Sequence, residues 1–401
     1  MQTRRATAIL ALTALFAAAP HPSSAQGGDS RDYLFLWTAS ADTTKPDFLA
    51  VVDVTVEDTS RMYGRLVTTL AVPGLRNVPH HTEHEMPADG QLFANGFGSG
   101  RTWIFDVRNP EAPRIAGEFA DVEGYGHPHS YVRLPNGNVL ATFQMRHDSS
   151  VVRPGGLVEI TSAGRVVRSA SADAPGLDPR TRVYSSGIVP ALDRIVTTTT
   201  DMDTDAEASR QLQIWRLSDL SLLRTIALPD GPAGGEGLLT AEPRLLADGR
   251  TVLVSTFACG LYLMEGLDTD APSARLVASF PRKENTYCAI PVIAGNFYLV
   301  TVPAWSAVVS LDISDPARPR EVSRLTLGPD DVPHWIALSP DRRRVVVTGY
   351  GAMMNRVVMA TFDTTTGALR LDERFGARDS AGTGLRIENG VPHGAVFNRR
   401  P

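Results

Sequence analysis

Two similar stretches, far apart in the chain, decide the fold class. The first reads Asp106-Val-Arg-Asn-Pro-Glu-Ala-Pro-Arg114, and the second reads Asp312-Ile-Ser-Asp-Pro-Ala-Arg-Pro-Arg320. Each follows an alternating apolar run that is typical of a strand, and each precedes another short strand. The Asn-Pro and Asp-Pro pairs are turn formers. A strand–turn–strand unit that recurs in this way indicates a repeat architecture built from β-strands.

A second pair of similar stretches covers two strands and the tight turn between them. One runs from His129 to Phe143 and the other from His334 to Thr348. Turns of the same kind recur about every 45 to 60 residues, which is the length of chain that a four-stranded propeller blade needs. These turns mark six blades and lie at Asp89-Gly90, Asn136-Gly137, Asp193-Arg194, Asp248-Gly249, Gly295-Asn296 and Asp341-Arg342.

The two ends of the chain supply a seventh blade. Val391–Phe397 has the pattern of an innermost strand with no outer strands after it, whereas residues 33–40, 46–54 and 63–73 have the pattern of three outer strands with no inner strand before them. Joining the termini would close the ring and remove free sheet edges. We therefore predict an all-β protein, a seven-bladed β-propeller closed by pairing of its N- and C-terminal strands.

The N-terminus has the features of an export signal. Arg4 and Arg5 precede a short apolar run, and Ser23-Ser24-Ala25 offers small residues for cleavage. We expect a signal peptide at 1–25, a single propeller domain at 26–401, and a periplasmic or secreted protein. No later segment has the apolar length of a membrane span. The net charge of −5 comes without a basic stripe, so we expect no nucleic-acid partner.

The chain has only two cysteines, Cys259 and Cys288. This number excludes a disulfide-rich scaffold and the cysteine-rich zinc and iron–sulfur patterns. An oxidising compartment would permit a disulfide between them. We nevertheless expect two buried free thiols in neighbouring strands.

Histidines occupy comparable positions in several blades. His129 and His334 stand at the same spacing before the turn residues Gly137 and Arg342, and His393 has the matching place in the closing strand. In the first full blade the same spacing falls one residue from His81. Innermost strands of a propeller surround one axis, so these side chains are expected to converge.

We therefore predict one metal site, with His81, His129, His334 and His393 as its ligands and catalytic residues. Neutral imidazoles without thiolates suit copper, iron or zinc rather than calcium or magnesium. The alternative is that these histidines are structural and form hydrogen bonds within their blades.

Three further histidines and one carboxylate are expected to support the site rather than to bind the metal. Adjacent residues on a strand point to opposite faces, which would turn His80 away from its neighbour. His84 and His127 are assigned either a supporting or a structural role. Glu242 falls near the axial position of its own blade and is a candidate supporting residue.

The same residues resemble the selenium-binding protein family, whose members include methanethiol oxidases. The similar stretches follow the same order over nearly the whole chain: Pro46–Val54, the His80-His81 pair after Val72-Pro-Gly-Leu, His129–Gly137, Pro154–Ile160, Asp312–Arg320 and Val391-Pro-His-Gly. The resemblance implies a seven-bladed propeller that uses copper to oxidise a small thiol with O₂, giving an aldehyde, hydrogen sulfide and hydrogen peroxide. His81 and His129 match family histidine positions.

The sequence also departs from the family. The strand at 33–40 lacks the cysteine that the family associates with selenium, Val132 replaces a family histidine, and His127 is added. We therefore expect an exported copper oxidase of a small thiol, with iron and zinc as alternative metals. The alternative function is a non-catalytic propeller scaffold that binds a metal or selenium.

Overall fold

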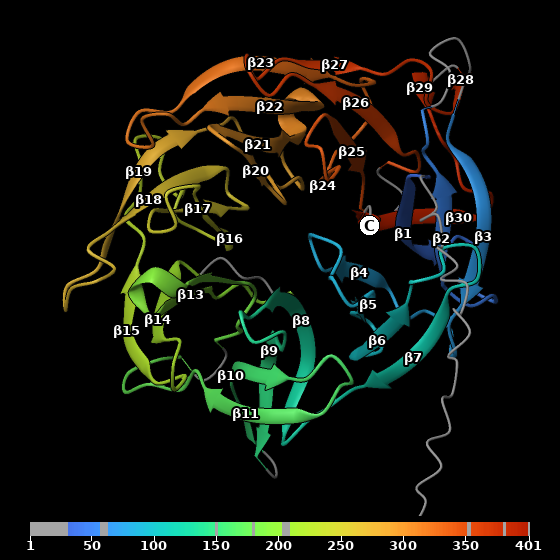
Figure 1. The fold of residues 1–401 in the computed structure, drawn as a ribbon. Helices are drawn as coiled ribbons and strands as arrows, with labels where there is room; N and C mark the ends of the chain where they lie inside the picture. Colours follow the sequence, from blue (N-terminus) through green and yellow to red (C-terminus); the bar gives the residue numbers. More distant parts are fainter. Residues whose placement is uncertain are drawn as a thin grey trace, which may run out of the picture. The chain divides into compact units, whose positions relative to one another are not determined.

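The fold is a ring of four-stranded sheets. The computed structural model describes residues 31–56, 63–148, 151–178, 181–202, 209–350, 354–379 and 382–399. Within these residues, seven four-stranded antiparallel sheets follow one another around a central axis (Figure 1). The described part of the chain contains no α-helix, and hence none long enough to cross a membrane. The predicted seven-bladed β-propeller is confirmed, whereas the predicted signal peptide at 1–25 lies outside the described residues.

The first four blades in chain order each run from an innermost to an outermost strand. The first contains β4 (Pro79–Thr82), β5 (Gln91–Gly96), β6 (Arg101–Asp106) and β7 (Arg114–Phe119). The second contains β8 (Tyr125–Arg133), β9 (Val139–Asp148), β10 (Val151–Ile160) and β11 (Val166–Ser171). The third contains β12 (Ser186–Val189), β13 (Arg194–Thr198), β14 (Gln211–Arg216) and β15 (Leu222–Ala227). The fourth contains β16 (Thr240–Leu245), β17 (Val252–Thr256), β18 (Gly260–Glu265) and β19 (Ser273–Ser279).

The remaining blades complete the ring. The fifth contains β20 (Val292–Ala294), β21 (Phe297–Val302), β22 (Ala307–Asp312) and β23 (Arg320–Thr326). The sixth contains β24 (Trp335–Leu338), β25 (Arg344–Thr348), β26 (Val358–Phe362) and β27 (Leu369–Leu371). The closing blade contains β30 (Gly390–Phe397), β1 (Tyr33–Ser40), β2 (Phe48–Asp53) and β3 (Arg65–Ala71). Outside the blades, β28 (Ala377–Asp379) and β29 (Gly382–Gly384) pair as a separate hairpin. Two short 3₁₀ helices are η1 (Pro190–Leu192) and η3 (Pro303–Trp305).

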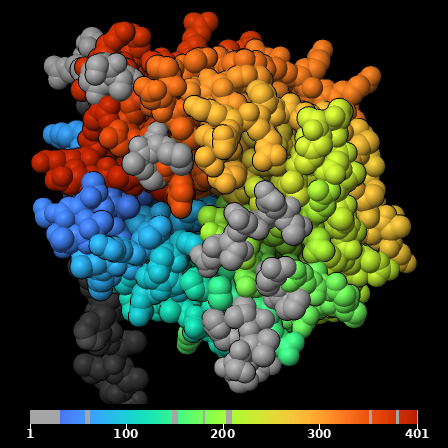
Figure 2. Space-filling model, turned by 180° about the vertical axis from the view of Figure 1, so that it is seen from behind, coloured from blue at the N-terminus to red at the C-terminus, as the bar shows by residue number. Residues whose placement is uncertain are grey.

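The closing blade joins the two ends of the described chain, as predicted. Strand β30 pairs antiparallel with β1, with Leu36 opposite Ala395 and Thr38 opposite Pro392. The side chain of Asn398 also accepts a hydrogen bond from the backbone N–H of Tyr33. Figure 2 shows the result as blue and red segments that lie side by side. The last strand is thus the innermost strand of a blade whose other three strands come from the N-terminal region.

All six predicted turns connect the first and second strands of their blades. In each turn one residue has a positive φ, and four of these six residues are glycines, the residue type that adopts this conformation without strain. The six residues are Gly90, Gly137, Asp193, Gly249, Gly295 and Arg342.

Both faces of each blade are buried, because every sheet packs between two others. In β1, Leu34 and Leu36 belong to one apolar cluster, together with residues of β24 and β25. The alternate residues Phe35 and Trp37 belong to another cluster, together with residues of β5 and β6. This two-residue alternation gives a nearly continuous apolar strand rather than one with a polar face.

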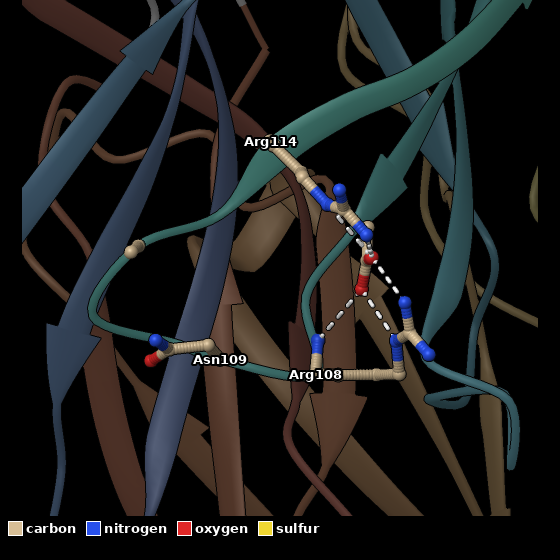
Figure 3. A pocket seen from close by; sticks show the side chains of 5 residues that line it. Arg108, Asn109 and Arg114 are labelled. Atoms are coloured by element: carbon tan, nitrogen blue, oxygen red, sulfur yellow. Dashed lines mark hydrogen bonds and ion pairs between the residues drawn. The ribbon is translucent and has the colours of Figure 1, made fainter.

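The repeated Asp-to-Arg stretch has a structural role. Asp106, at the end of β6, accepts hydrogen bonds from the guanidinium groups of Arg108 and Arg114 (Figure 3). These bonds, chiefly the one from Arg108, hold the pKa of Asp106 well below its usual range. Asp312 and Arg320 form the matching ion pair in the fifth blade. The pocket drawn in Figure 3 is therefore formed by the turn between β6 and β7, which these ion pairs hold together.

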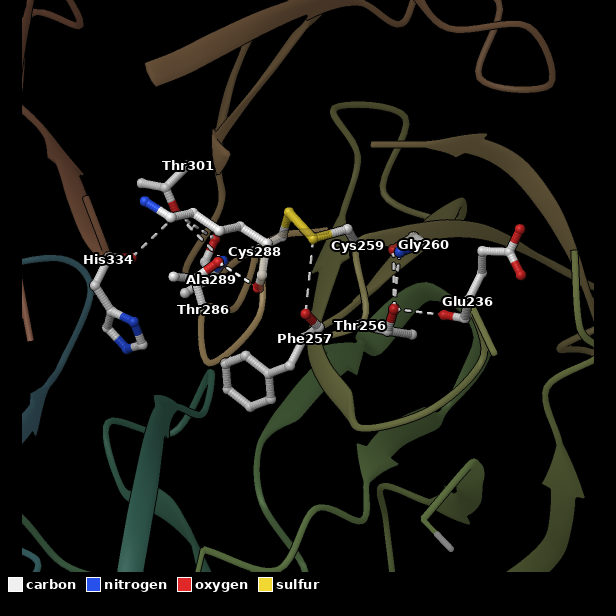
Figure 4. The surroundings of a disulfide bond; sticks show 11 residues. Glu236, Thr256, Phe257, Cys259, Gly260, Thr286, Cys288, Ala289, Thr301 and His334 are labelled. Carbon is white, nitrogen blue, oxygen red and sulfur yellow. Dashed lines mark hydrogen bonds between the residues drawn. A yellow bond between two sulfur atoms is a disulfide. The ribbon is translucent and has the colours of Figure 1, made fainter. Parts of the chain in front are cut away.

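The expectation of free cysteines is wrong. Cys259 and Cys288 form a disulfide, with their Cα atoms 5.0 Å apart (Figure 4). Neither cysteine lies in a strand: Cys259 is in the turn between β17 and β18, and Cys288 is in the segment that returns from β19 to the axis before β20. Strand patterns alone do not show where such a returning segment runs, so they could not place the two cysteines in contact.

Removal of the closing strand should destabilise the whole ring. We expect a chain that lacks its last eleven residues, from Val391 onward, to melt at least about 10 °C below the intact protein, because the loss exposes the inner edge of β1 and unpacks both neighbouring blades. Thermal unfolding by circular dichroism measures this effect. A control that lacks only Arg400 and Pro401 should melt like the intact chain. Equal melting temperatures for both truncations would contradict closure through β30.

Candidate metal centre

Five histidines from four consecutive blades meet at the axis. Strand β4 supplies two of them, β8 and β30 supply one each, and one directly precedes β24. All five side chains are buried, the most accessible being 8% exposed. They are His80, His81, His129, His334 and His393. The structure thus brings together all four predicted ligands, which come from contiguous blades as expected, and adds His80.

The rings form an elongated cluster with His80 in the middle. The ring of His80 stacks on that of His81, with 4.3 Å between centroids, and lies 4.9 Å from that of His129. The His80 ring also lies 4.6 Å from the ring of His393, which is in turn 4.9 Å from that of His334.

Two sets of three histidines have ligand atoms that all lie within 4.8 Å of one another. One set is His80, His334 and His393, and the other is His80, His81 and His129. Neither set contains both His129 and His334. The predicted ligands therefore belong to two adjacent groups that share His80.

A β-bulge explains why His80 does not point away from His81, as strict alternation along the strand would predict. Pro79 pairs with Gly96 and Thr82 pairs with Ala94, so β4 has one residue more than β5 between these two pairs. A bulge of this kind breaks the alternation of side chains along a strand. His80 and His81 consequently both face the axis, although they are neighbours in sequence.

The bulge also shows that His80, rather than His81, is the counterpart of the other axial histidines. The innermost strands β8 and β30 have the same bulge, immediately after Pro128 and Pro392. Each of these prolines is followed by an axial histidine, just as Pro79 is, and Pro333 precedes His334. The repeated Pro-His dipeptide was the sequence signal that could have identified His80.

Polar side chains of the second strands fix the backbone at the axial positions. The hydroxyl group of Thr348 in β25 donates a hydrogen bond to the carbonyl of His393 in the next blade, and Thr301 in β21 donates similarly to His334 (Figure 4). In β5 the corresponding residue is Asn95, which accepts from the N–H of His81 and donates to the carbonyl of Pro128. The backbones of His334 and His393, and that of Pro128 beside His129, are thereby tied to a neighbouring blade.

Burial keeps these imidazoles neutral. Loss of hydration, strengthened by the neighbouring histidines, lowers the pKa values of His80, His81 and His393 well below their usual value. Burial likewise lowers the pKa of His129 to about 3 and that of His334 to about 4. At neutral pH all five are therefore uncharged, which is the form that binds metals.

Backbone carbonyls orient two of the rings for metal binding. The Nδ1 atom of His129 lies 2.8 Å from the carbonyl oxygen of Tyr184, and Nδ1 of His393 lies 3.3 Å from that of Pro79. A carbonyl only accepts, so Nδ1 carries the proton in both rings and Nε2 has the free lone pair. Both Nε2 atoms are buried without a hydrogen-bond partner, as are Nε2 of His334 and the Nδ1 atoms of His80 and His81.

Aromatic side chains surround the cluster. The ring of Trp335 lies 5.1 Å from that of His81, and Tyr350 lies 5.3 Å from His334. Phe97 contacts His80 and His129. Tyr184, whose ring is 4.1 Å from that of His129, also places its hydroxyl group 3.2 Å from Nε2 of His81. The nitrogen donors are therefore enclosed by largely apolar walls.

His84 and Glu242 form a polar network beside the cluster. The His84 ring stacks on Trp335, and its Nε2 accepts a hydrogen bond from Arg244, whose guanidinium donates only. Arg244 also donates to Glu242, which in turn accepts from Ser185. Neither His84 nor Glu242 belongs to the two histidine sets, and their supporting role stays a prediction.

His127 lies outside the two histidine sets as well. Its backbone has a φ of 55°, and its ring packs against Gly100 and Phe97. This position fits the structural alternative that the sequence left open for His127.

The donor set fits a transition metal. Each histidine set offers three neutral nitrogen donors, and neither contains a carboxylate or a thiolate. Imidazole nitrogens suit copper, zinc and iron, whereas calcium and magnesium need oxygen ligands. The unpartnered nitrogens would otherwise be buried polar atoms without compensation. The histidine cluster could therefore hold a metal ion.

Comparison with known proteins supports the resemblance seen in the sequence. No family model matches the chain. A methanethiol oxidase from Hyphomicrobium sp is 25% identical over 228 residues, which cover 50% of this chain and 49% of that protein. The chain thus matches about half the length of this curated relative. A hypothetical selenium-binding protein from Sulfolobus tokodaii superposes with a TM-score of 0.74 at 16% identity, over 93% of this chain and 94% of that one. The chain is thus distantly similar to proteins that carry the names methanethiol oxidase and selenium-binding protein.

Other propellers resemble this chain in fold alone. The periplasmic gluconolactonase PpgL of Pseudomonas aeruginosa superposes with a TM-score of 0.65 at 16% identity, over 93% of this chain and 100% of that one. A putative 6-phosphogluconolactonase from Bacteroides fragilis gives a TM-score of 0.62 at 10% identity, over 94% of this chain and 100% of that one. At such identities the superposition carries no information about the reaction.

The neutral histidines should make the metal-free protein sensitive to acid. Their pKa values are lower in the folded state than the value near 6.5 of the unfolded chain, so the unfolded state binds more protons below that pH. Each such histidine then lowers the free energy of unfolding by up to about 1.4 kcal/mol per pH unit. We expect the melting temperature to be highest above pH 7 and to fall steeply between pH 6.5 and pH 5.

A matched variant tests the origin of this pH dependence. Replacement of His129 and His393 together by Gln should flatten the curve of melting temperature against pH. A metal-free wild-type protein that melts at the same temperature at pH 7.5 and pH 5 would show that the buried histidines do not control its stability.

Proposed function

We propose that the protein is an exported, copper-dependent oxidase that oxidises a small thiol with O₂. The observation that carries this proposal is the buried group of five neutral imidazoles with unpartnered nitrogens on the propeller axis. The distant similarity to methanethiol oxidase supplies the reaction class. Iron and zinc are alternatives that fit the same nitrogen donors.

Copper fits both the donors and the substrate. When bound, copper would accept electrons from a soft thiolate and pass them to O₂, which zinc cannot do because it has no redox chemistry. The nitrogens available to hold copper are Nε2 of His129, His334 and His393 and Nδ1 of His80 and His81.

The balanced reaction shows how many electrons and protons pass from the thiol to O₂ at the site. Conversion of a methyl thiol and water to an aldehyde and hydrogen sulfide releases two electrons and two protons. Reduction of O₂ to hydrogen peroxide takes up the same two electrons and two protons. The balanced reaction is thiol, O₂ and water giving aldehyde, hydrogen sulfide and hydrogen peroxide, so no other co-reactant is needed.

The surroundings of the cluster favour a small, largely apolar substrate. The aromatic rings of Trp335, Tyr350 and Phe97 are in direct contact with the imidazoles of His81, His334 and His80, respectively. Such walls accept a methyl group and exclude water from the nitrogen donors. They offer no counter-charge for a second ionised group on the substrate.

Tyr184 is suited to hold a proton beside the cluster. Burial raises the pKa of its phenol well above the usual value, so the hydroxyl group stays protonated. Its oxygen can accept the Nε2–H of His81, which leaves the lone pair of that ring on Nδ1 for the metal. Tyr184 is therefore a positioning residue for His81 rather than a ligand.

Loss of an axial histidine should remove both metal and activity. We expect Ala replacements of His81, His129, His334 or His393 each to lower the copper content of the purified protein and to reduce thiol-dependent O₂ consumption at least about 100-fold. Elemental analysis and an oxygen electrode with methanethiol measure the two effects. The melting temperature of the metal-free variants should change little, because strand pairing and apolar packing close the ring.

The control for these variants is His127→Asn. Asn tolerates the positive φ at this position, and His127 lies outside both histidine sets, so copper content and O₂ consumption should stay as in the wild type. Full copper in all four Ala variants would show that the histidines are structural. Copper without O₂ consumption from any small thiol would contradict the oxidase and favour a metal-binding scaffold.

Export is the part of the proposal that rests on sequence alone. Arg4, Arg5, the apolar run and Ser23-Ser24-Ala25 lead us to expect a mature protein that begins near Gln26 outside the cytoplasm. N-terminal sequencing of the native protein from separated cell fractions measures this. An intact Met1 in a cytoplasmic fraction would contradict export.

A further inference from the structure

The axial cluster has more nitrogen donors than one metal ion needs. Protein sites for a copper or zinc ion commonly use three or four protein ligands. Here five buried imidazoles converge, and each has a nitrogen without a hydrogen-bond partner. They do not all surround one point, because the His334 ring contacts that of His393, whereas the His129 ring contacts those of His80 and His81.

We propose that the cluster has two metal positions and binds two copper ions per chain. Position A is formed by His80, His334 and His393, and position B by His80, His81 and His129. This inference rests on the proposed function for the identity of the metal, whereas the two positions themselves follow from the geometry.

Each position has its own oriented ligand. In position A the carbonyl of Pro79 fixes the proton of His393 on Nδ1, and in position B the carbonyl of Tyr184 does the same for His129. The two free Nε2 lone pairs therefore belong to different sets of three. A single ion would leave at least one of these oriented, buried lone pairs without a partner.

His80 is placed to serve both positions. It is the only histidine that belongs to both described sets, and its ring contacts those of His393, His81 and His129. The two nitrogens of an imidazole have diverging lone pairs. If His80 gives up its N–H proton to solvent, it can bind one ion through each nitrogen.

The charge of the site favours copper in its monovalent state. Neither set contains a carboxylate, and the carboxylate of Glu242 is held by Arg244 and Ser185. Burying uncompensated charge is costly, and two divalent ions would bring twice the charge of two monovalent ions. A pair of ions that each exchange one electron would also match the two electrons that the thiol gives up and O₂ takes.

The number of bound ions tests the proposal directly. Metal-free protein is titrated with Cu(I) without oxygen and desalted, and copper is measured per chain. We expect two ions in the wild type and in His127→Asn. His129→Phe, which keeps the aromatic ring but removes the donor of position B, should bind one ion. His334→Phe, which removes a donor of position A, should also bind one ion, at position B. The double variant should bind none.

A second measurement on the wild type does not depend on the folding of any variant. After oxidation, two adjacent Cu(II) ions couple magnetically, so the spin count from electron paramagnetic resonance should fall well below the copper content. One ion per chain with a full spin count, and no copper in either single variant, would overturn the proposal and indicate one shared centre.

Activity on the same samples separates the two claims. Two copper ions without thiol-dependent O₂ consumption would contradict the oxidase and leave the two positions intact. O₂ consumption by wild-type protein that holds only one copper ion per chain would contradict the two positions and leave the oxidase intact.

Discussion

The pairing of β30 with β1 is the contact on which the rest of the structure depends. It closes the ring, so that every blade packs between two others, and it places His393 beside residues that come some three hundred positions earlier in the chain, as the contact of its Nδ1 with the carbonyl of Pro79 shows. Without this closure, the blades of β24 and β4 would not be held around a common axis. The histidine cluster therefore depends on the closed ring rather than on any single blade.

Much of this arrangement could be predicted because it follows from periodicity. Turn residues with a positive φ recur between the first and second strands, and the alternation of apolar residues reports burial on both faces of a blade. The same spacing located His129, His334 and His393 on the axis. A repeating pattern does not predict where a strand departs from its regular alternation. The bulge after Pro79 turned His80 toward the axis, against the expected alternation.

The disulfide was missed for a related reason. Cys288 lies in a segment without regular structure that returns from the outermost strand β19 to the axis, and Cys259 lies in a turn. Their proximity depends on the path of that segment, which the strand pattern does not describe. Hydrogen bonds between blades, such as that from Thr348 to His393, were equally invisible, because they depend on how neighbouring blades are placed around the axis.

The burial of unpartnered nitrogens favours binding of a metal ion by the histidine cluster. Five imidazoles are buried, each with one nitrogen that has no hydrogen-bond partner, and burying a polar atom without a partner costs free energy. A bound transition-metal ion would compensate for this cost, and the surrounding aromatic rings would keep water from competing for it. A cluster of structural histidines would be expected to satisfy its nitrogens within the protein.

The central claim is that these histidines hold copper. The most direct measurement is anomalous X-ray diffraction at the copper absorption edge, from crystals of the protein as purified from its native compartment. We predict anomalous peaks about 2 Å from Nε2 of His129 and from Nε2 of His393. Copper bound elsewhere on the protein, with no anomalous peak among the axial histidines, would contradict this account.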